Sequence, residues 1–328
     1  MHPGYLSLYK SGELERRIQR LLKRLERCNL CPRTCGVNRR KGAIGRCRAG
    51  YMLRVSTVQP HMGEEPVLSG SKGAGTIFFS HCNLECIYCQ NYRISQLAKG
   101  YDLDINTLAK HMLSLQDKGC HNIEWVSPSH YIPQILQALY IAIPMGLNLP
   151  IVYNSNGYDQ VAILRCLEGI VDIYLPDVKY SRNETAYELS NGKDYANVNR
   201  AALKEMYRQV GPGLILDSEG MARRGLIIRH LILPGYLMET REILKSIRKG
   251  LGNKVHISLM SQYFPTYKSS YHPNLKRPLT YKEYEEAVAI LEEEGFENGW
   301  TQSFKDINDD FRPDFDSENV FNSSLFNP

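Results

Sequence analysis

Seven of the nine cysteines in this 328-residue chain stand in two tight groups. One group reads C-x3-C-x2-C and consists of Cys82, Cys86 and Cys89. The other reads C-x2-C-x3-C-x11-C and consists of Cys28, Cys31, Cys35 and Cys47. The odd total and the close spacing argue against a framework of disulfides. Because closely spaced thiolates are ligands for zinc and for iron–sulfur clusters, the two groups predict metal chemistry.

The three-cysteine group directly follows the apolar run GTIFFS, which is typical of a buried strand. A four-iron cluster has four irons to ligate, so three thiolates leave one iron open to another ligand. An open position is typical of a working metal site, whereas a structural site is closed. The alternatives are a zinc knuckle completed by His81 and a set of buried free thiols.

The four-cysteine group supplies a complete set of thiolates, which predicts a structural or electron-transferring site. Gly42 and Gly45 permit the turns that bring Cys47 back to the other three. Zinc and an auxiliary iron–sulfur cluster fit this candidate second site equally well, and vacant or redox-sensing thiols are the third alternative. Cys120 and Cys166 stand in or beside expected helices, and we interpret them as ordinary buried residues.

Short runs rich in β-branched and aromatic residues alternate with helical patterns from about residue 74 onward. We expect strands at 76–80, 123–126, 150–153, 171–175, 226–233 and 255–259. The helical patterns end at Gly119, before Pro144, at Gly250 and at Gly295. Continuously apolar strands joined by helices predict an α/β fold with a parallel sheet. A partial barrel of six strand–helix units and a doubly wound open sheet both satisfy this pattern.

Polar side chains stand at the ends of the expected strands, where ligands gather in parallel α/β proteins. The candidates are Ser127, Ser129, Asn154, Asn156, Asp177, Lys179 and His230. Each one alone could equally be a helix cap or a turn residue. Asp177 and Lys179 are two residues apart, so their side chains point to one face. There Lys179 suits a carboxylate and Asp177 an ammonium, with a plain ion pair as the alternative.

The three-cysteine motif, with an aromatic residue before its last cysteine, resembles that of the radical S-adenosylmethionine (SAM) superfamily. The resemblance implies a partial (β/α)6 TIM-like barrel and a 4Fe–4S cluster held by Cys82, Cys86 and Cys89. It also implies that SAM chelates the fourth iron and that its reductive cleavage yields a 5′-deoxyadenosyl radical, which abstracts hydrogen from a substrate. In the family, the residue in the place of Tyr88 packs near the adenine.

Further stretches, among them CPRTCGVNR, GEEPVLSG and LPDVKY, resemble the pyruvate formate-lyase-activating enzyme-like branch. The resemblance implies that Asp177 and Lys179 hold the methionine end of SAM and that His230 contacts SAM. The branch's Gly-Gly-Glu stretch is absent, and SPSHYIP stands there, so Ser127, Ser129 or His130 must supply acceptors. Asn154, in the NSNG loop with Asn156, replaces an aspartate that some activases use for a monovalent cation.

The resemblance implies an oxidoreductase that takes electrons from a one-electron reductant of the flavodoxin or ferredoxin type. Its implied substrate is a glycyl radical enzyme, with another protein, a peptide or a small molecule as the alternative. A hypothesis of a different class is a non-catalytic iron–sulfur or zinc module for binding or electron transfer. We do not expect nucleic acid as a partner.

The composition excludes several classes of protein. Hydrophobic residues make up 43% and charged residues 23% of the chain, which excludes disordered, collagen-like and coiled-coil proteins. No stretch approaches the roughly 18 uncharged apolar residues of a membrane helix, and the first residues lack the apolar core of a signal peptide. We therefore expect a cytoplasmic protein without a membrane partner.

The net charge of +5 is unevenly distributed along the chain. Residues 16–48 hold twelve Lys or Arg and one acid, whereas residues 303–328 hold six acids and two bases. We expect a metal-binding extension at 1–51, a radical SAM barrel at 52–300 and a polar acidic tail at 301–328. The basic helix face near the start is interpreted as solvated, with docking of an acidic partner as the alternative. The tail is interpreted as mobile or wrapping, with a lid over the site as the alternative.

Overall fold

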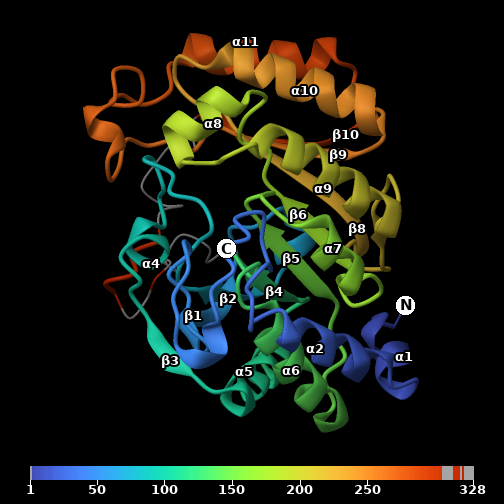
Figure 1. Cartoon of the computed structure of the whole chain (residues 1–328). Helices are drawn as coiled ribbons and strands as arrows, with labels where there is room; N and C mark the ends of the chain where they lie inside the picture. The colour runs from blue at the N-terminus through green and yellow to red at the C-terminus, as the bar shows by residue number, and fades with distance from the viewer. Residues whose placement is uncertain (1, 305–312, 318–319, 321–328) are drawn as a thin grey trace.

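The computed structural model describes residues 2–304, 313–317 and 320. In this part of the chain, a ten-stranded sheet has the order β10-β9-β8-β6-β5-β4-β2-β1-β3, and β7 pairs beside β8. Figure 1 shows the helices arranged around this sheet. The strands are β1 (Leu53–His61), β2 (Ala74–Phe79), β3 (Tyr101–Leu103), β4 (Ile123–Val126), β5 (Ile151–Ser155), β6 (Ile173–Pro176), β7 (Ile215–Leu216), β8 (Ala222–Leu231), β9 (His256–Met260) and β10 (Asn298–Thr301).

Seven neighbouring strands, β2, β4, β5, β6, β8, β9 and β10, run parallel to one another. They stand in the sheet in the order of the chain, and this order has no reversal. A doubly wound sheet reverses its strand order at a switch point, so the arrangement is that of a barrel. The sheet ends in β10 and β3, which do not pair with each other among the described residues. The predicted partial TIM-like barrel is therefore confirmed.

The six expected strands correspond to β2, β4, β5, β6, β8 and β9, but the sequence pattern missed β1, β3, β7 and β10. β1 is antiparallel to β2 and carries the mixed sequence LRVSTVQPH. Most of its residues are only half-buried. A strand of this kind lacks the continuous apolar run that marks the parallel strands.

Helices connect the parallel strands in the expected places. α11 begins with a complete capping box between Thr280 and Glu283, as the sequence predicts. The helices are α1 (Tyr5–Lys10), α2 (Glu13–Lys23), α3 (Pro66–Ser69), α4 (Tyr92–Ser95), α5 (Ile105–Asp117), α6 (Ile132–Ala142), α7 (Val161–Leu164), α8 (Asn183–Ser190), α9 (Tyr195–Val210), α10 (Leu237–Leu251) and α11 (Tyr281–Glu293).

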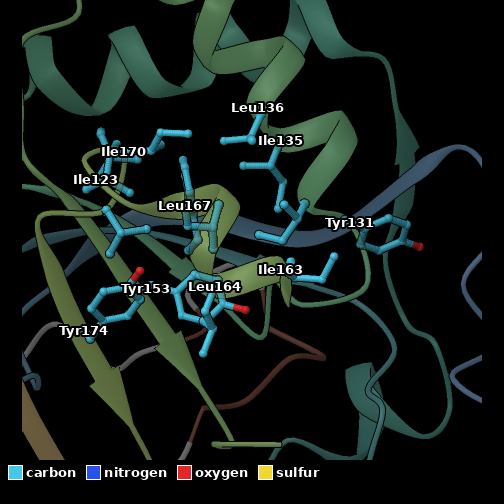
Figure 2. Close-up of a cluster of buried hydrophobic side chains, with 14 of the residues drawn as sticks. Ile123, Tyr131, Ile135, Leu136, Tyr153, Ile163, Leu164, Leu167, Ile170 and Tyr174 are labelled. Carbon is cyan, nitrogen blue, oxygen red and sulfur yellow. The ribbon is translucent and has the colours of Figure 1, made fainter. Parts of the chain in front are cut away.

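The main hydrophobic core lies between the outer face of the barrel strands and the helices. Because side chains alternate along a strand, Ile123 and Trp125 of β4 join this outer core. Figure 2 shows part of it, with Ile123 and Tyr153 from strands and Ile135 from α6. Each such fully buried side chain stabilises the fold by roughly 1.5–3 kcal/mol. The core thereby fixes which residues point into the barrel.

A smaller apolar cluster fills one end of the barrel interior. Val152, Ile173 and Ile227 from three strands contact Leu68 of α3 there. β1 runs antiparallel to β2, so its last residue His61 lies opposite Ala74, the first residue of β2. The chain from β1 to α3 therefore closes the barrel at the amino ends of the parallel strands. A binding site can therefore open only at the other end of the barrel, where the carboxyl ends of the parallel strands lie.

The first two helices pack on the same outer core as the barrel helices. Leu14 and Ile18 of α2 are buried in it. The Tyr5 hydroxyl donates to the carbonyl of Leu149 at 2.9 Å, and the Gly4 amide donates to Asp172 at 3.2 Å. The start of the chain is thereby tied to the barrel.

Candidate active site

A cavity of about 600 Å³ opens at the carboxyl ends of the parallel strands and extends into the barrel interior. This is the edge at which ligands bind in barrels of this kind. Nine of the side chains singled out from the sequence line this one cavity: Cys82, Cys86, Tyr88, Cys89, Ser127, Asn154, Asn156, Asp177 and Lys179.

The three barrel cysteines stand on a loop that leaves the end of β2. Hydrogen bonds fasten this loop to α8, because the Glu85 and Ile87 amides donate to the carbonyls of Ser190 and Leu189. The Tyr88 hydroxyl is within 2.7 Å of the hydroxyl of buried Tyr180. The loop thus holds its cysteines in the cavity wall through two backbone hydrogen bonds and the Tyr88 side chain.

Backbone conformation at two strand ends is unusual. His81 after β2 has a φ of 72°, and Ser127 after β4 has a φ of 57°. Residues other than glycine rarely adopt this left-handed backbone conformation, and those that do are concentrated at functional sites. Both residues line the cavity.

Burial is the main influence on the three thiols. Burial, together with a smaller effect of the neighbouring Cys86, raises the pKa of Cys82 to about 11 and that of Cys89 to about 12. The Leu84 amide and Asn156 Nδ2 donate to Cys82 Sγ at 3.4 and 3.2 Å, and Ser95 Oγ lies 3.2 Å from Cys89 Sγ. Half-buried thiols with donors aimed at their sulfurs suit ligation, because bound metal favours the thiolate.

The donor set of this cavity fits a cluster better than a single ion. Among the residues that the structure describes, no three His, Cys, Asp or Glu side chains are placed to hold one metal ion. Zinc requires its thiolates to converge on one ion. In an iron–sulfur cluster each thiolate binds a different iron. Three thiols that share a cavity without converging are therefore compatible with a cluster.

Asp177 and Lys179 form an ion pair in the cavity wall beside β6. Lys179 Nζ lies 2.6 Å from Asp177 Oδ2. Burial lowers the pKa of Lys179, but the charges of Asp177 and Cys86 outweigh it and raise this pKa well above its usual range. Lys179 is therefore a fixed positive charge next to the cysteines.

Two predicted site residues, Ser129 and His230, lie outside the cavity lining. Ser129 Oγ donates to Oδ1 of buried Asp159, which follows β5 in the chain, at 2.6 Å. The His230 ring lies 2.7 Å from the Val178 carbonyl and 2.9 Å from Thr240 Oγ1 of α10. His230 lies outside the cavity because side chains alternate along a strand. Its neighbour Arg229 in β8 points into the barrel, so His230 points out. His130 is also buried outside the lining, 2.8 Å from the Ser80 carbonyl.

Sequence reasoning noted Arg229 as a polar residue of its strand but assigned none of the charged residues inside the barrel to the site. Arg229, Glu64 and Glu65 line the cavity, and Glu124 of β4 is fully buried beside them. The available signal was a charged residue within a largely apolar strand, Glu124 in IEWV and Arg229 in LIIRHL. Such buried charges are rare without a role or a partner.

The four-cysteine group folds into a tight loop structure against the barrel. Cys28, Cys31 and Cys47 are buried, and Cys35 is exposed. A Cβ at Gly45 would collide with Cys35 Sγ, so the close approach requires glycine there. Burial raises the pKa of Cys31 to about 12, and the nearby Cys47 contributes. Cys28 and Cys35 also lie near enough to affect the Cys31 pKa, so the four residues are neighbours, but their thiols do not converge on one ion among the described residues.

Arg33 connects this four-cysteine group to the barrel cysteines. Its Nε donates to the Asn83 carbonyl at 2.8 Å, and its guanidinium lies over the Tyr158 ring at 5.4 Å. Asn156 Nδ2 in turn donates to both Asn83 Oδ1, at 2.7 Å, and Cys82 Sγ. One chain of contacts therefore joins the two cysteine groups.

No family model matches the chain. The chain is 33% identical to the uncharacterized protein MJ0674 of Methanocaldococcus jannaschii over 298 residues, which are 88% of this chain and 80% of that protein. The chain belongs to the MJ0674 family.

Solved structures similar to this MJ0674 family member share little sequence with it. They include anSMEcpe with bound AdoMet, at 13% identity and a TM-score of 0.46 over 65% of this chain and 57% of that one. Streptococcus suis SuiB bound to S-adenosylmethionine has 10% identity and a TM-score of 0.46, over 68% of this chain and 48% of that one. SuiB bound to precursor peptide SuiA has 10% identity and a TM-score of 0.48, over 68% of this chain and 46% of that one. This chain therefore spans about half the length of those proteins.

Part of the acidic tail of this MJ0674 family member packs at the cavity. Phe315 lies in a buried cluster with Ile94 and Val126, and its ring is 5.8 Å from that of Phe78. Asp316 pairs with Arg93 and Lys99. Residues 305–312, 318–319 and 321–328 of the predicted tail lie outside the described residues. Within the described part of the chain, no helix is long and apolar enough to cross a membrane.

Proposed function

We propose that this protein is a radical SAM enzyme that holds a 4Fe–4S cluster on Cys82, Cys86 and Cys89. One observation carries the proposal: the buried thiol of Cys86, the half-buried thiols of Cys82 and Cys89 and the Asp177–Lys179 pair line a single cavity at the carboxyl edge of a parallel barrel. The cavity supplies thiolates for three irons and separate charged groups for a second ligand. A structural metal site needs no such neighbours.

The cluster would be held by the three cysteines, with Asn156, the Leu84 amide and Ser95 as donors around their sulfurs. When bound, such a cluster supplies the electron that splits the sulfonium of SAM into methionine and a 5′-deoxyadenosyl radical. Donors to sulfur stabilise the reduced, more negative state. Tyr88, fixed by Tyr180, would support the adenine.

Lys179 and Asp177 would bind the methionine end of SAM. The fixed positive charge of Lys179 suits the carboxylate, and Asp177 suits the ammonium. Ser127 and Asn154 line the same cavity and offer further acceptors. His230 and Ser129, which the resemblance and the strand ends suggested, are engaged behind the strands, so we leave them out of this binding set.

For the substrate we propose hydrogen abstraction from a protein or peptide, with activation of a glycyl radical enzyme as the specific form that the branch resemblance suggests. A one-electron reductant of the flavodoxin or ferredoxin type would supply the electron. Residues 1–51 would serve as a metal-binding extension to the barrel of residues 52–300. Its four cysteines would be the ligands of zinc or of an auxiliary iron–sulfur cluster, and zinc would require their thiols to move together onto one ion.

The proposal is tested by reconstituting the protein with iron and sulfide without oxygen and adding dithionite and SAM. We expect 5′-deoxyadenosine, measured by liquid chromatography. Cys86→Ala should abolish the product because it removes one cluster ligand. Cys166→Ala is the matched control, since that thiol lies outside the cavity lining and contacts the Ala162 carbonyl. A protein that forms a cluster and never consumes SAM would contradict the proposal.

A further inference from the structure

A short segment of the acidic tail lies at the mouth of the cavity, and we call it the cover: residues 313–317 and Val320. Its first residue, Pro313, lines the cavity. The Phe315 side chain is only 5% exposed, and that of Val320 is 6% exposed. Both belong to one cluster of buried apolar residues with the barrel. Two apolar side chains of an otherwise polar segment are therefore buried against the barrel.

The surface that buries Phe315 belongs to the cavity. Its partners Phe78, Ile94 and Val126 all line the cavity. Phe78 of β2 and Val126 of β4 point into the barrel, because side chains alternate along a strand and the residue before each of them lies in the outer core. The Phe315 ring, 5.8 Å from that of Phe78, therefore enters the mouth of the barrel at β2 and β4.

The cover lies beside the loop that carries the barrel cysteines. Its partner Ile94 precedes Ser95, whose Oγ lies 3.2 Å from Cys89 Sγ. The Ile94 carbonyl accepts from the amide of His81, the residue before Cys82. A molecule that approaches Cys89 from the side of β2 therefore meets the cover first.

Ion pairs complete the attachment of the cover. Asp316 pairs with Arg93 of α4 and with Lys99. The three side chains are 43–44% exposed. Ion pairs between such exposed side chains contribute little and are screened by salt. They suit a contact that forms and breaks.

The cover can leave without disturbing the barrel. Among the described residues, it belongs to no strand of the sheet. The Asp314 amide donates to the Val320 carbonyl at 2.7 Å, and the Ser317 amide donates to the Asp314 carbonyl at 3.1 Å. These backbone hydrogen bonds lie within the cover, whereas the clustered apolar residues and the ion pairs join it to the barrel through side chains. Its departure would leave the backbone hydrogen bonds of the sheet intact.

We propose that the cover is an autoinhibitory plug, which shields the cysteines from bulky molecules and has to leave before a protein or peptide substrate reaches them. The Phe315 ring occupies the inward-facing surface at β2 and β4, so a large substrate and the cover compete for the same part of the mouth. The inference rests on the proposed function, because it takes the substrate to enter this cavity.

Thiol labelling of the full chain, purified without metal, measures access to the cavity. The bulky reagent is N-(1-pyrenyl)maleimide, the small one is iodoacetamide, and mass spectrometry follows the loss of unlabelled Cys89. Phe315→Ala removes the ring from the mouth and should speed the reaction of Cys89 with the maleimide several-fold. The gain with iodoacetamide should be smaller. An unchanged rate with the maleimide would overturn the inference.

Phe304→Ala is the matched control from the same tail. Its ring packs against α11, 5.2 Å from the Tyr281 ring and 5.6 Å from that of Tyr284, and it is absent from the cavity lining. Cys89 should react as in the unaltered chain. Equal acceleration by Phe304→Ala and Phe315→Ala would overturn the inference.

Reversal of charge tests the cover without removing its ring. Asp316→Arg places a like charge beside Arg93 and Lys99, so it should open the cover and speed the maleimide reaction. The triple change Asp316→Arg, Arg93→Glu and Lys99→Glu restores opposite charges and should slow the reaction again. A triple variant that reacts as fast as Asp316→Arg would overturn the inference.

Labelling of Cys120, which is buried in the outer core, identifies a variant that is unfolded. If Phe315→Ala unfolds the chain, Asp316→Arg takes its place, since this exposed side chain contributes nothing to the core. An unchanged rate at Cys89 in Asp316→Arg would then overturn the inference.

The labelling experiment requires neither cluster nor SAM, so it separates this inference from the proposed function. If 5′-deoxyadenosine forms in the reconstituted protein and the variants do not change labelling, the inference alone is wrong. If the variants open the cavity and SAM is never cleaved, the proposed function is wrong and the shielding of the cysteines by the cover still stands.

Discussion

Lys179 is the residue whose loss should weaken SAM binding most directly. It is a buried positive charge beside the cysteines, held 2.6 Å from Asp177. A hydrogen bond to a charged group contributes about 1.5–3 kcal/mol, and 1.4 kcal/mol is a factor of ten in affinity. We therefore predict that Lys179→Met lowers the affinity for SAM by roughly 10- to 100-fold, measured by equilibrium dialysis.

Lys193→Met serves as the control for this change, because Lys193 is absent from the cavity lining. It should bind SAM like the unaltered protein. Equal affinity of the Lys179 and Lys193 variants would show that Lys179 does not contact SAM.

At the residue scale, spacing predicted which side chains are available but not always which way they point. Cys82, Cys86, Cys89, Asp177 and Lys179 do line one cavity, because their positions follow from a strand end and from a separation of two residues. His230 lies outside the lining, and in a buried strand with apolar residues on both faces the sequence pattern does not reveal which face points inward. The neighbouring Arg229 occupies that face.

At the scale of elements, Arg33 should stabilise the contact between the four-cysteine group and the barrel loop. Its hydrogen bond to the Asn83 carbonyl and its position over Tyr158 together predict a loss of ~1–2 kcal/mol in Arg33→Ala. The free energy of unfolding is measured by denaturant titration. Hydrogen exchange of the Glu85 and Ile87 amides, which fasten the loop, should also become faster.

Arg27→Ala is the matched control, because Arg27 is exposed and precedes Cys28 in the same group. It should leave both the free energy of unfolding and the exchange rates unchanged. Equal effects of the two substitutions would contradict a connecting role for Arg33.

Asp172 makes the attachment of α1 to the sheet dependent on pH. Burial raises the pKa of this carboxyl from 3.8 to about 6, while it accepts the amides of Ile151 and Gly4. The folded state therefore favours the protonated form. The contribution of Asp172 to the free energy of unfolding is therefore largest below pH 4. It declines by up to about 3 kcal/mol as the pH rises to 6.

Asp172→Asn removes this titration, so the comparison isolates it from other carboxyl groups. We predict that the unfolding free energy of the unaltered protein minus that of Asp172→Asn falls between pH 4 and pH 6 and is constant above. Denaturant titrations at several pH values measure it. A difference that does not change with pH would contradict the assignment.

The sequence predicted the six buried parallel strands because their apolar runs are continuous, as in β4 and β6. It did not predict β1, whose alternating and half-buried residues resemble a loop. The position of Glu64 and Glu65 depends on β1, since this strand returns the chain to the amino end of the barrel. That part of the site required the three-dimensional arrangement.

At the scale of the whole molecule, the two cysteine groups should bind metal independently. Arg33 and Asn156 connect them, but they share no cysteine. We predict that a variant with Cys82, Cys86 and Cys89 all changed to Ala retains metal, measured by elemental analysis. Zinc near one per chain without iron would exclude an auxiliary cluster. A Cys31→Ser change should then remove the remaining metal.

A metal-free triple variant that is still folded would contradict independent binding. The Cys120→Ala change provides the control for loss of a buried thiol, because Cys120 is buried in the outer core and belongs to neither group. It should leave the metal content of both sites unchanged.

We propose that one cavity holds the cluster and SAM in contact. Electron paramagnetic resonance of the reduced, reconstituted protein tests it most directly, because a ligand on the open iron changes the signal of the cluster. We predict that SAM alters this signal, and that Lys179→Met requires more SAM for the same change. A signal that stays the same at saturating SAM would contradict the claim.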